Sequence, residues 1–170
     1  MSTRSRVLWI LNALLVVGAL ALVGVGGWQM VTKSRPAPAS PANQPELRLA
    51  VLEAASRITE KILTYSPDTV ELDLADGSSG LTGDFAEYYK KFSKETIVPG
   101  AREKQVKTTA TVVQSGIISI DSPEQAAALV FIDQVTTSLD FPEPNHATSS
   151  VRVGLTKVDG RWLIESFDPV

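Results

Sequence analysis

The longest apolar segment of the chain lies near its N-terminus, where residues 7–31 include no charged side chain. As a helix this segment would be about 37 Å long, which exceeds the ~30 Å hydrocarbon core of a bilayer. Trp9 and Trp28 stand near its two ends, where indole rings favour the lipid headgroup layer. The pattern predicts a single transmembrane helix over residues 7–31.

Basic residues flank the apolar segment on both sides, with Arg4 and Arg6 before it and Lys33 and Arg35 after it. Together with the amino terminus they give a slight bias toward a cytoplasmic N-terminus. We therefore expect residues 1–6 to form a short cytoplasmic tail and residues 46–170 to form an extracytoplasmic domain, anchored to the cell membrane by residues 7–31. A cleaved signal peptide is the alternative, but its apolar core is ordinarily about 7–15 residues long.

Helical patterns dominate the middle of the chain, after a proline- and alanine-rich linker over residues 32–45. A first helix is expected over about residues 45–65, followed by a short helical segment over 69–75 and a loop over 76–80. The next helix begins near residues 82–84, and Pro99 and Gly100 interrupt or end it. Apolar residues spaced three and four apart mark the faces of the two longer helices: Leu47, Val51, Ala54, Ile58 and Ile62 in the first, and Phe85, Tyr88, Tyr89 and Phe92 in the other.

Strand patterns fill the chain after Lys107. Residues 108–120 are rich in β-branched side chains, and residues 126–138 are apolar on both faces, which is typical of a central strand. Residues 151–156 alternate between apolar and polar, and residues 161–167 return after Asp159 and Gly160, a strong hairpin signal. Helices followed by hairpin-linked strands predict an α+β domain over residues 46–170, with helices on one face of a curved four-stranded antiparallel sheet. A sheet curved around a helix into a cone leaves room for a pocket.

Composition narrows the classes of function. The chain has no cysteine, which excludes disulfides and thiolate chemistry. All 19 acidic residues lie at or after Glu46, whereas only 12 of the 16 basic residues do. Such an acidic domain is a poor candidate for binding nucleic acid, because phosphate recognition needs a basic surface.

Few side chains suggest chemistry, and we expect no catalytic residue, cofactor or metal. His146 is the only histidine and is expected in a surface loop, without the partners that a metal site or a catalytic triad needs. Asp133 lies within an apolar strand and could face a pocket as a general base, although a carboxylate that faces solvent or pairs with a lysine is the simpler interpretation. Aromatic residues at Tyr88, Phe92, Phe131 and Trp162 are candidates for the lining of a lipid pocket, although helix–sheet core is the simpler interpretation for them.

Five short segments of the chain resemble those of the actinobacterial Mce-associated membrane proteins. These segments are LTGDF (81–85), VPGAREK (98–104), TATVV (109–113), KVDGRWL (157–163) and FDPV (167–170). The glycine at position 100 departs from the family pattern, in which a larger residue more often follows the proline. The resemblance implies a fold like nuclear transport factor 2, also described as cystatin-like, and similar to the extracytoplasmic domain of a type IV secretion scaffold subunit. It also implies a non-enzymatic accessory subunit that stabilises or organises an Mce-type lipid importer.

The expected partners follow from this organisation. They are the lipid bilayer, through residues 7–31, and transporter or other envelope membrane proteins, with a homodimer as a further possibility. Three alternatives remain open: a tethered binding module for a lipid or sterol, a scaffold subunit of a secretion-type envelope complex, and a membrane-tethered isomerase or hydratase with Asp133 as its base.

Overall fold

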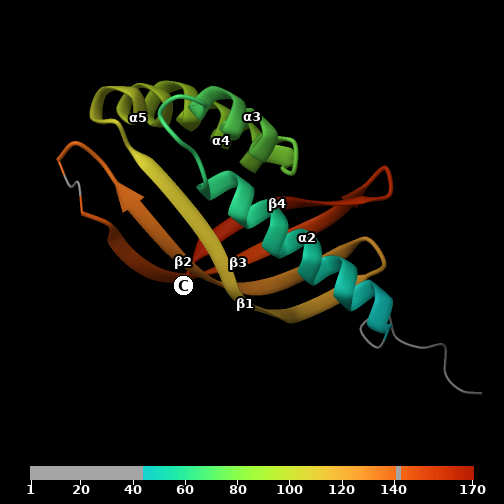
Figure 1. Ribbon diagram of the computed structural model, residues 1–170. Coiled ribbons are helices and arrows are strands. Elements are labelled where there is room, and N and C mark those ends of the chain that lie inside the picture. The colour runs from blue at the N-terminus through green and yellow to red at the C-terminus, as the bar shows by residue number, and fades with distance from the viewer. Residues whose placement is uncertain (1–43, 141–142) are drawn as a thin grey trace, which may run out of the picture. The chain divides into compact units, whose positions relative to one another are not determined.

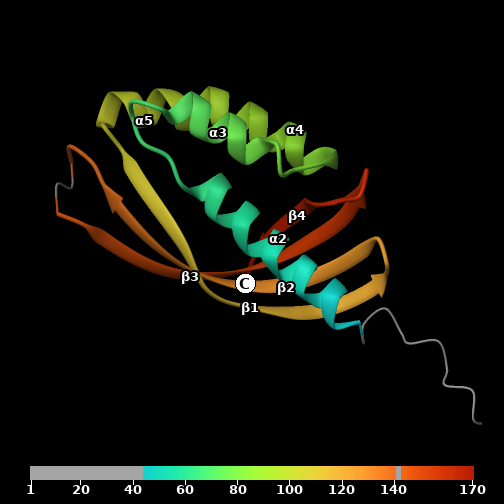
Figure 2. The same ribbon diagram turned by 45° about the vertical axis from the view of Figure 1, so that its right-hand side comes forward.

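The computed structural model describes residues 44–140 and 143–170, and the predicted tail, transmembrane helix and nearly all of the linker lie outside them. Within the described part of the chain, no helix combines the length and the apolar character needed to cross a bilayer. The described elements are four helical segments, one π turn and four strands, arranged as helices on one side of a sheet (Figures 1 and 2).

Helix α2 (Pro45–Leu63) begins with a proline, whose fixed φ suits the first helical turn. Its predicted apolar stripe is confirmed, since Val51, Ala54, Ile58 and Ile62 are all buried. The helix crosses the sheet diagonally in Figure 1 and packs mainly on strand β1. The residues of α2 spaced three and four apart therefore form the helical side of the core.

Helix α3 (Val70–Ser78) extends into the segment predicted to be a loop, so that prediction is wrong for residues 76–78. The reason is Gly77, which brings α3 against the backbone of α2. A Cβ atom at Gly77 would lie 3.0 Å from the carbonyl oxygen of Lys61. Gly77 therefore serves close packing of α3 on α2 and does not form a turn.

Pro99 and Gly100 do not end the next helix, contrary to the sequence prediction. Helix α4 (Gly83–Phe92) runs into a π turn, η2 (Ser93–Ile97), which leads directly into helix α5 (Val98–Lys104). The wider turn places Pro99 in the first turn of α5, where its missing N–H is tolerated. The helix ends instead at Gln105, which adopts a left-handed conformation with φ of 51°.

The four strands form one antiparallel sheet in chain order: β1 (Lys107–Ser122), β2 (Gln125–Thr137), β3 (Asn145–Val158) and β4 (Arg161–Pro169). Asp159 and Gly160 make the β3–β4 turn with positive φ angles, as predicted. Irregular register occurs three times between β1 and β2 and once between β3 and β4. Bulges of this kind bend strands, and the sheet curves visibly in Figure 2.

The core lies between α2 and the covered face of the sheet. Val130, Ile132, Val153, Leu155 and Ile164 are completely buried there. The outer edge of β1 is protected by side chains of α2. The Ala110 N–H donates to Thr64 Oγ1 at 3.0 Å, and the Val112 N–H donates to Glu60 Oε1 at 2.8 Å. These bonds satisfy backbone groups that an edge strand would otherwise leave free.

Candidate functional site

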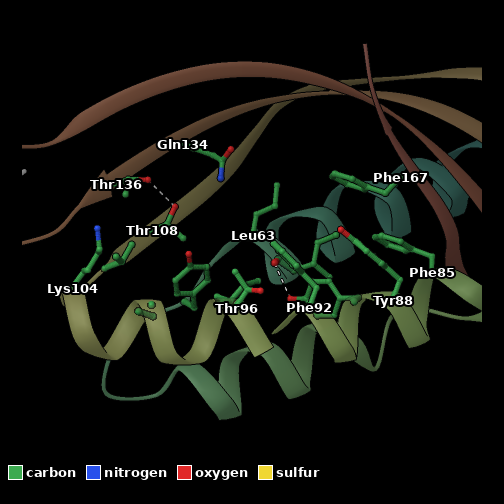
Figure 3. Close-up of a pocket in the computed structure, with 17 residues that line it drawn as sticks. Leu63, Phe85, Tyr88, Phe92, Thr96, Lys104, Thr108, Gln134, Thr136 and Phe167 are labelled. Atoms are coloured by element: carbon green, nitrogen blue, oxygen red, sulfur yellow. Dashed lines mark hydrogen bonds between the residues drawn. The ribbon is translucent and has the colours of Figure 1, made fainter. Parts of the chain in front are cut away.

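A cavity of about 520 Å³ lies between the α4–η2–α5 helical segment and the sheet, beyond the C-terminal end of α2. Its volume is within the range of about 300–1,000 Å³ that is typical of small-molecule sites. Most of its lining is apolar or aromatic, with polar groups from α5, β1 and β2 (Figure 3). The lining residues are Ile62, Leu63, Tyr65, Phe85, Tyr88, Tyr89, Phe92, Thr96, Ile97, Gly100, Ala101, Lys104, Val106, Thr108, Gln134, Thr136 and Phe167.

Aromatic rings form one end of the cavity. The ring of Phe85 stacks on that of Phe167 with centroids 5.8 Å apart and an interplanar angle of 2°. Tyr88 and Phe92 stack on each other at 5.8 Å, one helical turn apart. Their exposed fractions are 62% for Tyr88 and 41% for Phe92, although both residues line the cavity. Such exposed aromatic rings offer apolar contact area to a ligand that enters the cavity.

Tyr89 fixes the helical wall of the cavity to α2. Its buried hydroxyl donates a hydrogen bond to the backbone oxygen of Ile62 at 2.9 Å. This carbonyl belongs to the last turn of α2, where helices leave oxygens without partners. Burial raises the pKa of Tyr89 well above its ordinary value of 10.0, and burial also raises the pKa of Tyr65. The Tyr89 hydroxyl therefore keeps its proton at physiological pH and can donate it to the Ile62 oxygen.

Polar side chains gather at the opposite end of the cavity (Figure 3). The hydroxyl of Thr136 donates to that of Thr108 at 3.1 Å, across the β1–β2 pair. Lys104 Nζ lies 3.2 Å from Asp140 Oδ2, and both side chains are more than half exposed. Gln134 extends its amide into the same region and has no hydrogen-bond partner within the described residues. This end therefore presents an ammonium group, a carboxamide and hydroxyls as hydrogen-bonding groups.

The aromatic residues that were candidates for a pocket or core lining occupy three different settings in the structure. Tyr88 and Phe92 line the cavity, so the core interpretation is wrong for these exposed rings. Trp162 is buried in the core, with Lys157 Nζ 5.8 Å from its ring centroid, and it does not line this cavity. Phe131 is 38% exposed and belongs to neither group.

Asp133 also lies away from the cavity. Its neighbours Ile132 and Gln134 face the helices, which places Asp133 on the uncovered face of β2 together with Phe131. Asp133 Oδ1 accepts a hydrogen bond from Thr148 Oγ1 at 2.8 Å in an exposed setting. A pocket role for Asp133 and Phe131 is therefore wrong. The simpler interpretation is confirmed in its solvent-exposed form, and the partner of the carboxylate is a threonine instead of a lysine.

His146 lies in β3, opposite Val135, and not in the loop where it was expected. It is exposed and is not among the residues that line the cavity. The described residues include no group of three side chains that could hold a metal ion.

Several residues that line the cavity were not predicted from the sequence, namely Leu63, Tyr65, Thr108, Gln134 and Phe167. The helical spacing of Phe85 with Tyr88 and Tyr89 did indicate a shared face. No comparable signal marks Phe167, because the irregular register near Gly154 breaks the alternation of β4. Gln134 could not be assigned to the cavity from the sequence, because its strand has apolar residues on both faces.

Comparisons with known proteins place this geometry in context. No protein-family model matches the chain. The solved structures that share its fold include an IcmL-like type IV secretion system protein of Legionella pneumophila, with a TM-score of 0.60, 14% identity, and coverage of 72% of this chain and 91% of that one. The VirB8 protein of Agrobacterium tumefaciens gives a TM-score of 0.58 at 13% identity, over 75% of this chain and 94% of VirB8. The periplasmic domain of DotI gives 0.56 at 15% identity, over 72% and 94%.

The predicted fold is thus confirmed as an α+β domain of the kind seen in type IV secretion proteins. Two relatives are much closer in sequence, and both are from Mycobacterium tuberculosis. "Uncharacterized protein Rv1362c" is 42% identical over 92% of this chain and 70% of its own length. "Outer membrane protein Rv1973" is 39% identical over 72% of this chain and 76% of its own length. The chain therefore belongs to the protein family of mycobacterial Rv1362c and Rv1973.

Proposed function

We propose that this chain is a non-enzymatic, membrane-anchored scaffold subunit of a cell-envelope complex, with residues 46–170 outside the cytoplasm. The observation that carries the proposal is the fold, which the described domain shares with an IcmL-like type IV secretion system protein, with VirB8 and with the periplasmic domain of DotI, over nine-tenths or more of those solved chains. The name of one relative, an outer membrane protein, supports a place in the envelope. The apolar segment 7–31 supplies the anchor in this proposal.

The role in an Mce-type lipid importer is a more specific form of the same proposal. Its support is the resemblance of short sequence segments such as LTGDF (81–85), whereas the fold supports a secretion-type scaffold. The two forms differ in the partners that they require. The proteins crosslinked to the chain in cells would distinguish them.

The test is site-specific photocrosslinking of the full-length chain in intact cells. A photoreactive residue is placed at Leu72 of α3 in one variant and at Phe131 on the uncovered sheet face in another, because both positions are exposed. We expect one of the two positions to give a discrete adduct, either with one envelope protein or with a second copy of the chain. The other position should give no adduct. A chain that stays uncrosslinked at both positions and purifies alone from the membrane would overturn the proposal.

A second candidate function is reversible binding of an apolar ligand in the cavity. The observation that favours it is the aromatic end of the cavity, where Phe85 and Phe167 stack and Phe92 remains partly exposed. A domain that served only as a rigid docking body would gain stability by filling this space with side chains. The two functions are compatible, because a scaffold can also hold a ligand.

A further inference from the structure

The cavity is polarised along its length. Figure 3 shows Phe85, Phe92 and Phe167 toward one end, and Lys104, Gln134 and Thr136 toward the other. The aromatic end offers apolar contact and no charge. A ligand that fills the whole cavity must therefore combine an apolar body with a polar group at one end.

The polar end offers one cationic group and hydrogen-bond donors that are not all used within the described residues. Lys104 carries three N–H donors, and Asp140 accepts a hydrogen bond from one of them. The amide of Gln134 adds two donors without a partner in the described chain, and the Thr136 hydroxyl is already bonded to Thr108. Lys104 is also the only charged residue among those that line the cavity. A head group with several acceptor oxygens and a negative charge matches this set.

The ion pair between Lys104 and Asp140 does not prevent such binding. Their side chains are 60% and 57% exposed, and exposed pairs of this kind contribute only about 0–1 kcal/mol. A ligand carboxylate could share the ammonium group or replace Asp140 at little cost. Asp140 then acts as a competitor for the ligand's head group.

On these grounds we propose that the cavity binds a single-chain amphiphile with a carboxylate head, that is, a long-chain fatty acid. The carboxylate lies at Lys104 and Gln134, and the chain runs past Leu63 toward Phe85 and Phe167. The proposal rests on the second candidate function, since it names the ligand of that same cavity.

The test uses a palmitic acid analogue with a diazirine near the end of its tail, together with its methyl ester and its alcohol. The full-length chain in amphipol is irradiated with each probe, and labelled peptides are identified by mass spectrometry. Labelling of residues 7–31 reports general partition into apolar surroundings and is the internal reference. We expect the acid to label the segment 83–92 above this reference, and the ester and the alcohol to label it more weakly.

Charge variants give predictions of opposite sign. Lys104→Gln should weaken labelling by the acid about threefold, because it removes the cation that pairs with the carboxylate. Asp140→Asn should strengthen labelling by a similar factor, because it removes the carboxylate that competes for Lys104. Lys91→Gln is the matched control, because it removes the same charge from an exposed position that does not line the cavity. All three changes should leave labelling by the methyl ester unchanged.

Two outcomes would contradict the proposal, and they separate its parts. Equal labelling by acid, ester and alcohol, with no effect of Lys104→Gln, would overturn the carboxylate head group and leave apolar binding in place. Labelling of segment 83–92 that never exceeds the reference would overturn the ligand site as a whole. Thr96→Trp, which places a bulky ring at an exposed lining position, should abolish labelling if the cavity is the site. The scaffold function is judged by crosslinking in cells and does not depend on these results.

Discussion

At the scale of single residues, Tyr89 connects the cavity to the stability of the domain. Its ring lines the cavity, while its hydroxyl closes the last turn of α2 by bonding the Ile62 oxygen. The ring is 6% exposed, so its partner oxygen cannot turn to water if the hydroxyl is removed. A buried acceptor left without a donor costs about 1–3 kcal/mol.

We therefore expect Tyr89→Phe to lower the free energy of unfolding by about 1–2 kcal/mol at neutral pH. Burial raises the pKa of Tyr89 in the folded state, whereas the unfolded residue ionises near 10. The stabilisation is thus complete below about pH 10 and is lost as the pH rises further, because only the unfolded state then releases the proton. Urea unfolding between neutral pH and about pH 11 should show this loss, with a shallower slope in Tyr89→Phe than in the parent.

The control for this change is Tyr88→Phe, which removes the same hydroxyl from an exposed ring one position away. It should leave the free energy of unfolding at neutral pH within about 0.5 kcal/mol of the parent. Equal losses from both substitutions would show that the Tyr89–Ile62 hydrogen bond does not stabilise the domain.

Side-chain directions mark the limit of what the sequence could predict at this scale. Asp133 and Phe131 lie in a strand with apolar residues on both sides, so alternation could not decide which face they share. The partner strands decide it, because Ile132 lies opposite Val112 and beneath α2. In the α4 aromatic stripe, Tyr89 is buried while Tyr88 and Phe92 border a cavity that no periodicity reveals.

At the scale of elements, two helical glycines have opposite roles. Gly77 brings α3 against the backbone of α2, and a Cβ there would lie 3.1 Å from the Ile62 Cα. Gly100 lies within α5, and a Cβ there would meet no atom within 4 Å. The first glycine is required by packing, whereas the second only lowers the helix propensity.

The same substitution should therefore change stability in opposite directions. Gly77→Ala is expected to destabilise the domain by about 1–3 kcal/mol, because two backbone segments must move apart. Gly100→Ala is expected to stabilise it by about 0.5–1 kcal/mol, since alanine favours the helix and meets no obstacle. Thermal and urea unfolding of the two variants measure both effects. A loss of stability in Gly100→Ala would contradict the open space seen at that position.

Element boundaries were predicted well where a local signal determines them. Pro45 starts α2, and the pair Asp159–Gly160 makes the last hairpin, as the sequence indicated. The error at Pro99 has a physical cause, because a π turn upstream resets the helix and removes the usual conflict of an internal proline. That turn carries no distinctive residue in its sequence SKETI, so only the folded chain shows it.

At the scale of the whole molecule, residues 44–140 and 143–170 form a helical layer and one curved sheet, and these helices cover one face of the sheet (Figure 2). The order of helices and strands along the chain predicted this α+β architecture. The cavity could not be predicted in the same way. It depends on contacts between segments far apart in the sequence, such as Phe85 with Phe167. Short-range patterns carry no information about the space left between such segments.

The two faces of the sheet can be distinguished by adjacent residues of one strand. Ile132 is completely buried beneath α2, whereas Phe131 is 38% exposed on the uncovered face. We expect Ile132→Ala to cost about 2–5 kcal/mol of unfolding free energy, because it opens a void in the core. Phe131→Ala should cost less than about 1 kcal/mol despite its larger change in volume, because water can fill the space that it leaves. Urea unfolding of the two variants measures both values. Similar losses of unfolding free energy in the two variants would mean that Phe131 is also packed against other side chains. That result would contradict a sheet with helices on one face and solvent on the other.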